Sequence, residues 1–481
     1  MARPGRAPWA LLAFAILIAP WSPARAQSFT DALVSAYQTN PAFQADHARQ
    51  RALDEDVARA AGGWKPQAAL NGTYGDGRDQ IYSQSSSEIN PFTGQVIPIP
   101  GHLHQHIIPE TYSLQIVQPI YDGGRASADV DRSKATVVAG KSHAVSVEQS
   151  TLGDAIQTYY DLYRDQALVG LAKQDVKWLQ DEKKATDQLF AKQQVTRTDV
   201  AQSDSRLAQG IARQVAAQGA VGSSESAFAR ATGLYPSPNL PAPPPLPKAL
   251  LPSSLQEAMS LASQNPTVRE AEHAIKAAEA DVDFTASALK PTLSLQASSN
   301  YQSETSEKNF AQRYNEVIAA VSIPIYTGGT DYARVREAKN ILNQRKFEAD
   351  DARRLAVDRA KRAWEDLTST RARIEFLKQQ VKSAEIARQS IITERSVGTR
   401  TTLDQLISEQ DWVDADTALI QAQHDEAIAT YSLLSAVGRL TARTLHLPVA
   451  LYDPDENYNK ESGRWFGTDI PEQQVPIPQA P

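Results

Sequence analysis

The sequence predicts an α+β membrane protein in which a few short strands continue into a long antiparallel helical part. Three observations lead to this fold class. Most of the chain consists of two similar copies, each copy contains short runs of alternating apolar and polar residues, and each copy ends in a long segment without proline. Alternation with a period of two is typical of strands, and apolar residues at heptad spacing are typical of long paired helices.

The N-terminus has the pattern of a secretory signal peptide. Arg3 and Arg6 precede an apolar run over 9–19, and Ala24-Arg25-Ala26 has the small-x-small pattern of a cleavage site. We therefore expect residues 1–26 to be a signal peptide that is absent from the mature protein.

The internal repeat gives the expected domain boundaries. Motifs of the first copy that recur at matching places in the second are Asn40-Pro41 with Asn265-Pro266, Lys65-Pro66 with Lys290-Pro291, and Gly123-Gly124 with Gly328-Gly329. A proline-rich stretch, by composition an extended spacer, separates the copies. We expect a first structural repeat over 27–235, a linker over 236–252, a second repeat over 253–441 and a C-terminal tail over 442–481.

A helix opens each copy. Ser28-Phe29-Thr30-Asp31 and Ser254-Leu255-Gln256-Glu257 resemble capping boxes, in which a serine and an acidic residue three positions later bind each other's backbone. We expect these helices to run to Trp64 in the first copy and to about Leu289 in the second, with an interruption at the Asn-Pro step.

Two strands follow this helix in each copy. Leu293, Leu295 and Ala297 alternate with polar residues, which predicts a strand with one wet and one apolar face. Tyr112, Leu114 and Ile116 alternate in the same way. The first copy has about twenty extra residues between its two strands, and we expect a long surface loop there because loops tolerate insertions.

The number of strands has a consequence for assembly. No stretch after the signal peptide approaches the ~20 apolar residues of a membrane helix, so a membrane span has to consist of strands closed into a barrel. Four strands per chain cannot close one, because the smallest barrels have about eight. We therefore expect an oligomer. A three-fold assembly gives a ring of six similar units with twelve strands.

The segment that ends each copy is strongly helical. Proline is absent from 121–235 and from 325–447, and apolar residues recur at heptad a and d positions. These seams include Leu162, Val169 and Val176 in the first copy, and Leu367, Ile374 and Val381 in the second. A helix over about 331–395 would be ~100 Å long at ~1.5 Å per residue, which requires a coiled-coil-like rod.

Glycines mark the expected bends of the chain. We expect Gly123, Gly124, Gly328 and Gly329 to form the bends from strand to long helix. Gly398 is expected in a tight turn, after which an antiparallel helix returns from Thr402 to about Leu440.

The turn sequence resembles a known family. Ser396-Val397-Gly398-Thr399-Arg400-Thr401-Thr402-Leu403-Asp404 is similar to the periplasmic tip turn of the TolC family of outer-membrane efflux and type I secretion proteins, and Ser435-Ala436-Val437-Gly438-Arg439-Leu440 to the end of its last long helix. The resemblance covers Ser28 to about Leu440. It implies a homotrimeric twelve-stranded β-barrel in the outer membrane, continued by a helical barrel in the periplasm.

The resemblance also implies partners and a function. A periplasmic adaptor (a membrane fusion protein) and an inner-membrane transporter, ABC-type or proton-driven, are the expected partners. The expected role is a channel-tunnel that exports proteins, small toxic compounds or both, and that opens at its periplasmic tip on partner contact. The residues themselves leave the cargo and the adaptor open.

Four positions are implied to form the entrance gate. They are Thr198 and Asp199 in the first copy, and Arg400 and Asp404 in the second. The sequence departs from the family pattern nearby. Ile407 stands where a second acidic residue is frequent, Arg395 where an aromatic is common, and Lys192-Gln193 in place of Val-Gly in the first copy.

Simpler interpretations accompany these expectations. Thr196-x-x-Asp199 and Thr401-x-x-Asp404 have the pattern of helix N-caps, a role that requires no gate. His102, His104 and His106 alternate in the long loop, as metal ligands on one side of a strand do, although a polar surface loop accounts for them more simply.

Composition limits the remaining classes of function. The chain has no cysteine and a net charge of −7, which argues against cysteine-bound metals and against nucleic acid as a partner. No catalytic or cofactor-binding motif is recognised, so we expect neither an enzyme nor a bound cofactor. The alternative from another class is a coiled-coil structural or adhesion protein of the cell envelope without a pore.

Overall fold

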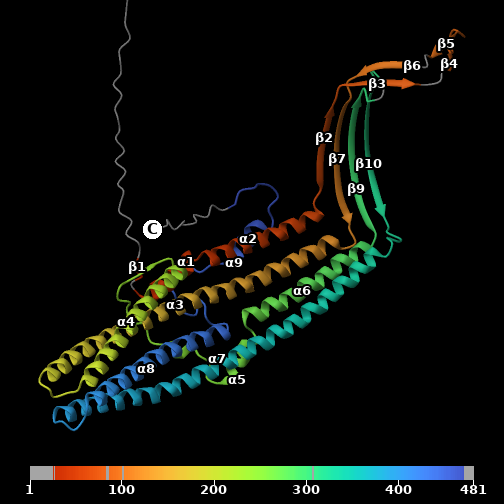
Figure 1. Ribbon diagram of the computed structural model, residues 1–481. Helices are drawn as coiled ribbons and strands as arrows, with labels where there is room; N and C mark the ends of the chain where they lie inside the picture. Colours follow the sequence, from red (N-terminus) through yellow and green to blue (C-terminus); the bar gives the residue numbers. More distant parts are fainter. Residues whose placement is uncertain (1–24, 27, 83–85, 100–101, 306–307, 471–481) are drawn as a thin grey trace, which may run out of the picture.

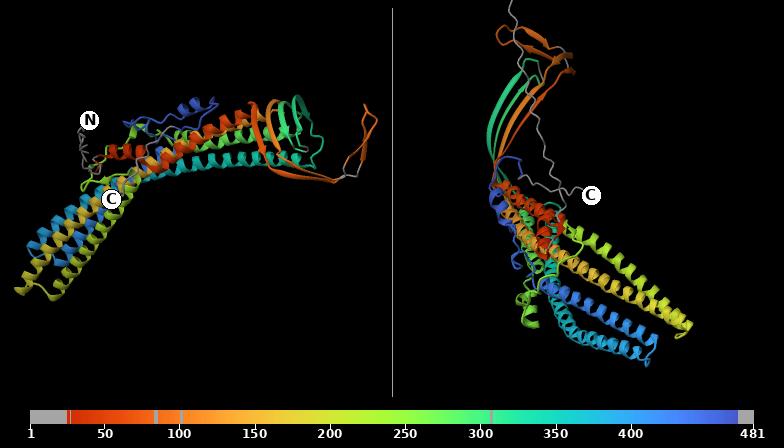
Figure 2. Two further views of the ribbon diagram at one scale, coloured as in Figure 1. Left: turned by 90° about the horizontal axis from the view of Figure 1, so that it is seen from above. Right: turned by 90° about the vertical axis from the view of Figure 1, so that its left-hand side faces the viewer.

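The molecule is elongated, with a curved β-sheet at one end and two helical hairpins at the other (Figures 1 and 2). The computed structural model describes residues 25–26, 28–82, 86–99, 102–305 and 308–470. The expected signal peptide thus lies outside the described residues, apart from β1 (Arg25–Ala26), which pairs in parallel with β8 (Tyr235–Pro236). None of the described helices is both long and apolar enough to cross a membrane.

The two sequence copies fold into the same succession of elements. The first contains α1 (Phe29–Thr39), α2 (Pro41–Ala61), β2 (Gln67–Tyr74), β7 (Glu110–Tyr121), α3 (Arg125–Ala191) and α4 (Arg197–Thr232). The second contains α5 (Leu255–Ala262), α6 (Pro266–Ala286), β9 (Thr292–Ser303), β10 (Ala311–Ser322), α7 (Thr330–Ser396) and α8 (Thr402–Ala436). Short 3-10 turns follow α2 (η1, Gly62–Trp64), precede α5 (η2, Lys248–Leu250) and follow α6 (η3, Ser287–Leu289).

The Asn-Pro steps interrupt the opening helices, as predicted. Asn40 Oδ1 accepts hydrogen bonds from the backbone of Ala42 at 2.9 Å and of Phe43 at 3.4 Å, so it caps α2, and Pro41 fills the first helical position. Asn265 caps α6 through Thr267 N at 3.1 Å. Proline is favoured at this position because its missing N–H would have no partner there.

The four predicted strands form one antiparallel sheet in the order β10-β9-β7-β2. Tyr112 pairs with Tyr301, and Ile116 with Ala297, so apolar residues of neighbouring strands share one face. β2 and β10 are the two edges of this sheet.

The long loop of the first copy is largely exposed, as expected, but it also contains paired strands that were not expected. β3 (Gly77–Tyr82) pairs with β6 (His102–Ile107), and β4 (Ser86–Ile89) pairs with β5 (Val96–Ile99). These paired strands project beyond the far end of the sheet (Figure 1). Strand pairing gives the backbone groups of this exposed segment hydrogen-bond partners within the chain.

The long helix of the second copy has the predicted extent, and the first copy contains one of the same length. α3 and α7 each contain 67 residues. α8 ends at Ala436, earlier than the expected Leu440, because Gly438 adopts a left-handed φ of +75° and Arg439 N donates to Leu434 O at 2.8 Å. This is a common way to end a helix, since it gives the last carbonyl groups partners.

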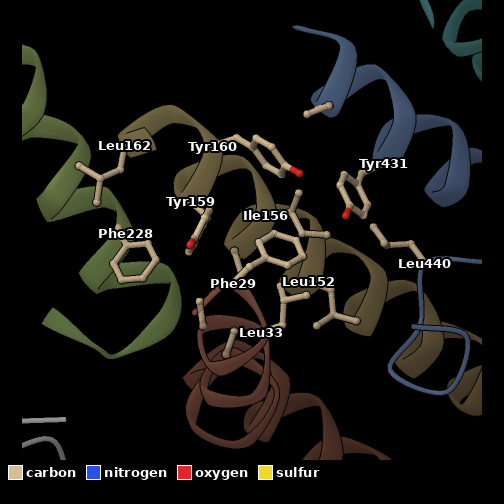
Figure 3. Close-up of a cluster of buried hydrophobic side chains, with 14 of the residues drawn as sticks. Phe29, Leu33, Leu152, Ile156, Tyr159, Tyr160, Leu162, Phe228, Tyr431 and Leu440 are labelled. Carbon is tan, nitrogen blue, oxygen red and sulfur yellow. The ribbon is translucent and has the colours of Figure 1, made fainter. Parts of the chain in front are cut away.

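The largest hydrophobic cluster joins the two repeats (Figure 3). Phe29 of α1 packs edge-on against Tyr159 of α3, with ring centroids 5.1 Å apart. Tyr160 of α3 faces Tyr431 of α8 at 6.1 Å, and Phe228 of α4 is fully buried beside Tyr159. Burial of such side chains contributes about 1.5–3 kcal/mol each, so this cluster anchors both helical hairpins at their base.

The linker between the repeats packs against this cluster. Tyr159 OH donates to Pro241 O at 2.8 Å, and Leu240 N donates to Gln166 Oε1 at 3.0 Å while its side chain is buried. The proline-rich stretch is therefore extended, as its composition indicates, but it is fixed to α3.

Candidate functional site

The tips of the two helical hairpins have the same backbone turn. Gly398, between α7 and α8, has a φ of +83°, and Gln193 adopts +59° at the matching place between α3 and α4. Thr399 N donates to Glu394 O at 3.1 Å, and Gln194 N to Leu189 O at 2.9 Å. The first copy therefore makes the turn without glycine. Gln193 has to adopt the left-handed backbone conformation, which is strained for a residue with a side chain.

Asp199 and Asp404 both form capping boxes. Asp199 Oδ2 accepts from Thr196 N at 2.8 Å and from Thr196 Oγ1 at 2.7 Å, and Asp404 Oδ2 accepts from Thr401 N at 2.9 Å and from Thr401 Oγ1 at 2.8 Å. These bonds favour the ionised carboxylates and hold the pKa of both groups below the ordinary value. The capping role expected from the sequence is therefore present at both tips.

Arg400 pairs within its own hairpin. Its Nε lies 2.8 Å from Glu394 Oε2, and about half of each side chain is exposed. This contact raises the pKa of the guanidinium. Thr198 lies exposed on the first turn of α4. Within one chain, Arg400 thus contacts neither Thr198 nor Asp199.

A buried network that the sequence did not predict connects the two hairpins instead. Arg395 Nη1, at the end of α7, lies 2.5 Å from Glu182 Oε1 of α3. Gln405 Nε2 of α8 donates to Glu182 Oε2 at 3.3 Å, and Gln405 also bonds Arg395. The Glu182 side chain is 8% exposed and that of Arg395 is 16% exposed. The one sequence signal was Arg395 itself, an arginine at a place where the resemblance led us to expect an aromatic residue.

Two further charge contacts lie along the hairpins. Arg388 of α7 pairs with buried Glu409 of α8 at 3.0 Å and stacks over Trp412 at 4.4 Å. Burial raises the pKa of Glu409 above its ordinary value in spite of this partner. Arg213 of α4 bonds Gln410 of α8, and His424 Nε2 of α8 lies 2.9 Å from Asp161 of α3, so further contacts join the two hairpins nearer their base.

The glycine pairs lie at the opposite ends of the long helices. Gly123 and Gly124 have φ values of +71° and +87° between β7 and α3, and Gly328 and Gly329 have +68° and +81° before α7. Asp122 caps α3, because its carboxylate accepts from Gly124 N and Arg125 N at 3.0 Å and from Ala126 N at 2.6 Å. These residues turn the chain from sheet to helix and are remote from the tips.

The histidine run lies on β6, and its register places His104 opposite Gln80 and His106 opposite Arg78. His106 Nε2 contacts Asp76 at 2.5 Å. In the part of the chain that the structure describes, no group of three or more His, Asp or Glu side chains is arranged to hold a metal ion.

Comparison with known families matches both copies. The model of a family described as outer membrane efflux protein matches residues 32–234 and 259–439. The outer membrane efflux protein BepC of Brucella suis is 30% identical over 451 residues, which cover 93% of this chain and 93% of that protein. The alkaline protease secretion protein AprF of Pseudomonas aeruginosa is 24% identical and covers 70% of this chain and 71% of its own length.

Solved structures share the fold. The Campylobacter jejuni CmeC outer membrane channel superposes with a TM-score of 0.72 at 15% identity, over 96% of this chain and 98% of that chain.

Proposed function

This chain belongs to the outer membrane efflux protein family, and from that premise we propose that three copies close one channel whose entrance is held shut at the hairpin tips. It is an outer-membrane channel-tunnel that extends into the periplasm, in a family of transport channels and not of enzymes. The family assignment therefore replaces the alternative of a pore-free structural or adhesion protein.

The two unpaired edges of the β-sheet are the observation that supports a trimer. β2 and β10 leave rows of backbone N–H and C=O groups without strand partners among the described residues. Lipid offers such groups no hydrogen bonds, so each edge has to pair with another chain. Pairing of β2 with β10 of the next copy repeats the antiparallel order and gives twelve strands when three copies close the ring.

Cysteine cross-linking tests this arrangement, because the chain has no native cysteine. Leu70 of β2 is replaced by cysteine and combined with single cysteines along β10 from Ala311 to Ser322. We expect disulfide-linked trimers for one short stretch of β10. A monomer that keeps its β-signal in detergent and forms no cross-link along β10 would refute it.

The partners are proposed by analogy with the relatives. BepC is named for efflux and AprF for alkaline protease secretion, which supports export of small toxic compounds, proteins or both. We infer that a periplasmic adaptor and an inner-membrane transporter, ABC-type or proton-driven, deliver the cargo. Affinity purification of the cross-linked envelope complex tests this, and recovery of the trimer with neither kind of protein would contradict it.

We propose that the tip residues expected from the sequence and the buried Arg395–Glu182 network together hold the entrance closed. The hairpin tips contain Thr198, Asp199, Arg400 and Asp404. In a three-fold assembly, the three copies of each residue would lie around the channel axis. The Arg395–Glu182 pair holds the second hairpin to the first within each copy. Adaptor binding opens the entrance by favouring the state in which the hairpins separate, since a partner shifts an equilibrium only by its differential affinity.

A further inference from the structure

The segment after α8 returns along α2 to the foot of the sheet (Figure 1). It contains α9 (Pro454–Glu461), in which Asn457 Nδ2 donates to Asp54 Oδ2 of α2 at 2.9 Å. Tyr452 N donates to Tyr37 OH at 3.0 Å, and the ring of Tyr452 stacks on that of His47 with centroids 3.7 Å apart. The segment is therefore fixed to the body of the molecule.

A turn after α9 presents two aromatic side chains to the surroundings. Arg464 organises this turn, because its Nε donates to Phe466 O at 3.1 Å, its Nη1 donates to Asp469 O at 2.9 Å, and Nη1 also pairs with buried Glu461 at 3.1 Å. Trp465 is 61% exposed and Phe466 is 86% exposed. Such side chains, held out by a structured turn, indicate a contact surface.

The position of this turn is set by Lys65. Lys65 Nζ lies 4.5 Å from the centroid of the Trp465 ring and donates to Arg464 O at 3.5 Å. β2 begins at Gln67, directly after the Lys65-Pro66 step. The two aromatic side chains therefore lie at the level where the helical part ends and the sheet begins.

A hydrogen bond of Gln118 shows on which face of the sheet the turn with Trp465 and Phe466 lies. Gln118 of β7 is opposite Leu295 of β9 and shares a face with Ile116, which is opposite Ala297. Its Nε2 donates to Trp64 O at 2.9 Å. The residue before Lys65 is thus held on the apolar face, and in an outer-membrane barrel the apolar face is the one in contact with lipid.

We propose that Trp465 and Phe466 insert into the headgroup region of the periplasmic leaflet of the outer membrane, so that the C-terminal segment is a membrane anchor outside the barrel. Tryptophan favours this region because its ring is apolar and its N–H is polar. Lys65, beside the indole ring, supplies a cation at the level of the lipid phosphates. The proposal rests on the outer-membrane placement of the sheet.

Single-cysteine labelling tests the anchor in the full-length trimer. A fluorescent label is placed at Phe466→Cys, at Leu70→Cys on β2 as a lipid-facing reference, and at Ala45→Cys as a reference in water. Ala45 is exposed on α2 and lies about 30 Å from Lys65 at ~1.5 Å per residue. The trimers are reconstituted into vesicles with and without brominated phospholipid, which quenches only nearby labels.

We expect quenching at position 466 to lie between the strong quenching at position 70 and the absent quenching at position 45, since an interfacial group enters only ~5–10 Å. In the Phe466→Cys background, Trp465→Ser should reduce this quenching at least by half, and the matched Trp465→Tyr should keep it.

The possible failures are distinguishable. Quenching at position 70 with none at position 466 overturns the anchor alone. A label at 466 that is shielded from water but not quenched by lipid also overturns it, because a neighbouring subunit then covers the site. An unquenched label at position 70 refutes the membrane placement of the sheet, and with it the proposed channel.

Discussion

Removal of the Glu182 charge is the sharpest test of the entrance. Glu182→Gln keeps the shape of the side chain but leaves Arg395 with only neutral partners, Gln405 and Thr402. Both members of the original pair are largely buried. Loss of one partner of a buried pair costs about 3–5 kcal/mol, because the remaining charge stays unpaired away from water.

The matched control is Glu394→Gln. It removes the acidic partner of Arg400, which lies on the same hairpin but is about half exposed. An exposed pair contributes only about 0.2–1 kcal/mol. Since about 1.4 kcal/mol corresponds to a tenfold change in an equilibrium, Glu182→Gln should shift the closed–open equilibrium at least a hundredfold and Glu394→Gln less than tenfold.

Single-channel conductance of the purified trimer in planar bilayers measures this difference. We expect Glu182→Gln to raise the conductance clearly and Glu394→Gln to leave it near the wild-type level. The double variant Glu182→Gln/Arg395→Gln should recover part of the closed state, because no buried charge is left unpaired. If Glu182→Gln has wild-type conductance and only a lower melting temperature, the Arg395–Glu182 pair merely stabilises the fold. That result would refute its role in closing the entrance.

The remaining predictions concern the tips. In the assembled channel we expect Arg400 to pair with Asp199 or Thr198 of a neighbouring hairpin. Arg400→Ser should then leave trimer formation intact and raise conductance, with Asp199→Ala acting similarly and their double variant less than additively; unchanged conductance in both would confine these residues to other roles. Asp404→Ala should weaken cation selectivity, measured as a reversal potential in a salt gradient, because it removes three charges from one ring, and a loss of helix stability alone would identify a cap. Gln193→Gly should stabilise the first hairpin by up to ~1 kcal/mol in calorimetry, since it relieves a left-handed backbone at some entropic cost, whereas a lower melting temperature would contradict the strain. The lowered pKa values of Asp199 and Asp404 mean that both caps are fully effective above the unfolded pKa of about 3.9 and are lost as the pH falls through the folded values. The protection factors of amides in the first turns of α4 and α8, that is, the intrinsic exchange rates divided by the observed ones, should therefore be unchanged down to pH ~5 and fall only below pH ~4.

Local signals in the sequence were sufficient for most elements. Asn40 ends α1 and caps α2, and Asn265 caps α6, through bonds to residues two or three positions later. Gly124 and Gly329 take the left-handed conformation that a change from strand to helix requires. These effects act within one turn of chain, so the order of the main elements of each repeat and the extent of α7 followed from spacing alone.

Local sequence signals predicted only part of the candidate site. The caps at Asp199 and Asp404 were predicted, because the Thr-x-x-Asp pattern contains both partners. The Arg395–Glu182 pair was not, since Glu182 resembles the other acidic residues of its helix and its partner is distant in sequence.

The sequence by itself determined the two repeats and the positions of the turns. It also determined that each chain has four main strands, too few to close a barrel without leaving unpaired edges. The tertiary structure alone decided how these parts meet: the docking of the linker on Tyr159, the pairing of strands within the long loop, and the return of the C-terminal segment to Lys65. The physical reason is the range of the interactions. Propensity, capping and periodicity act between neighbours, whereas contacts between distant segments depend on the packing register of whole helices and on burial that exists only after they have assembled.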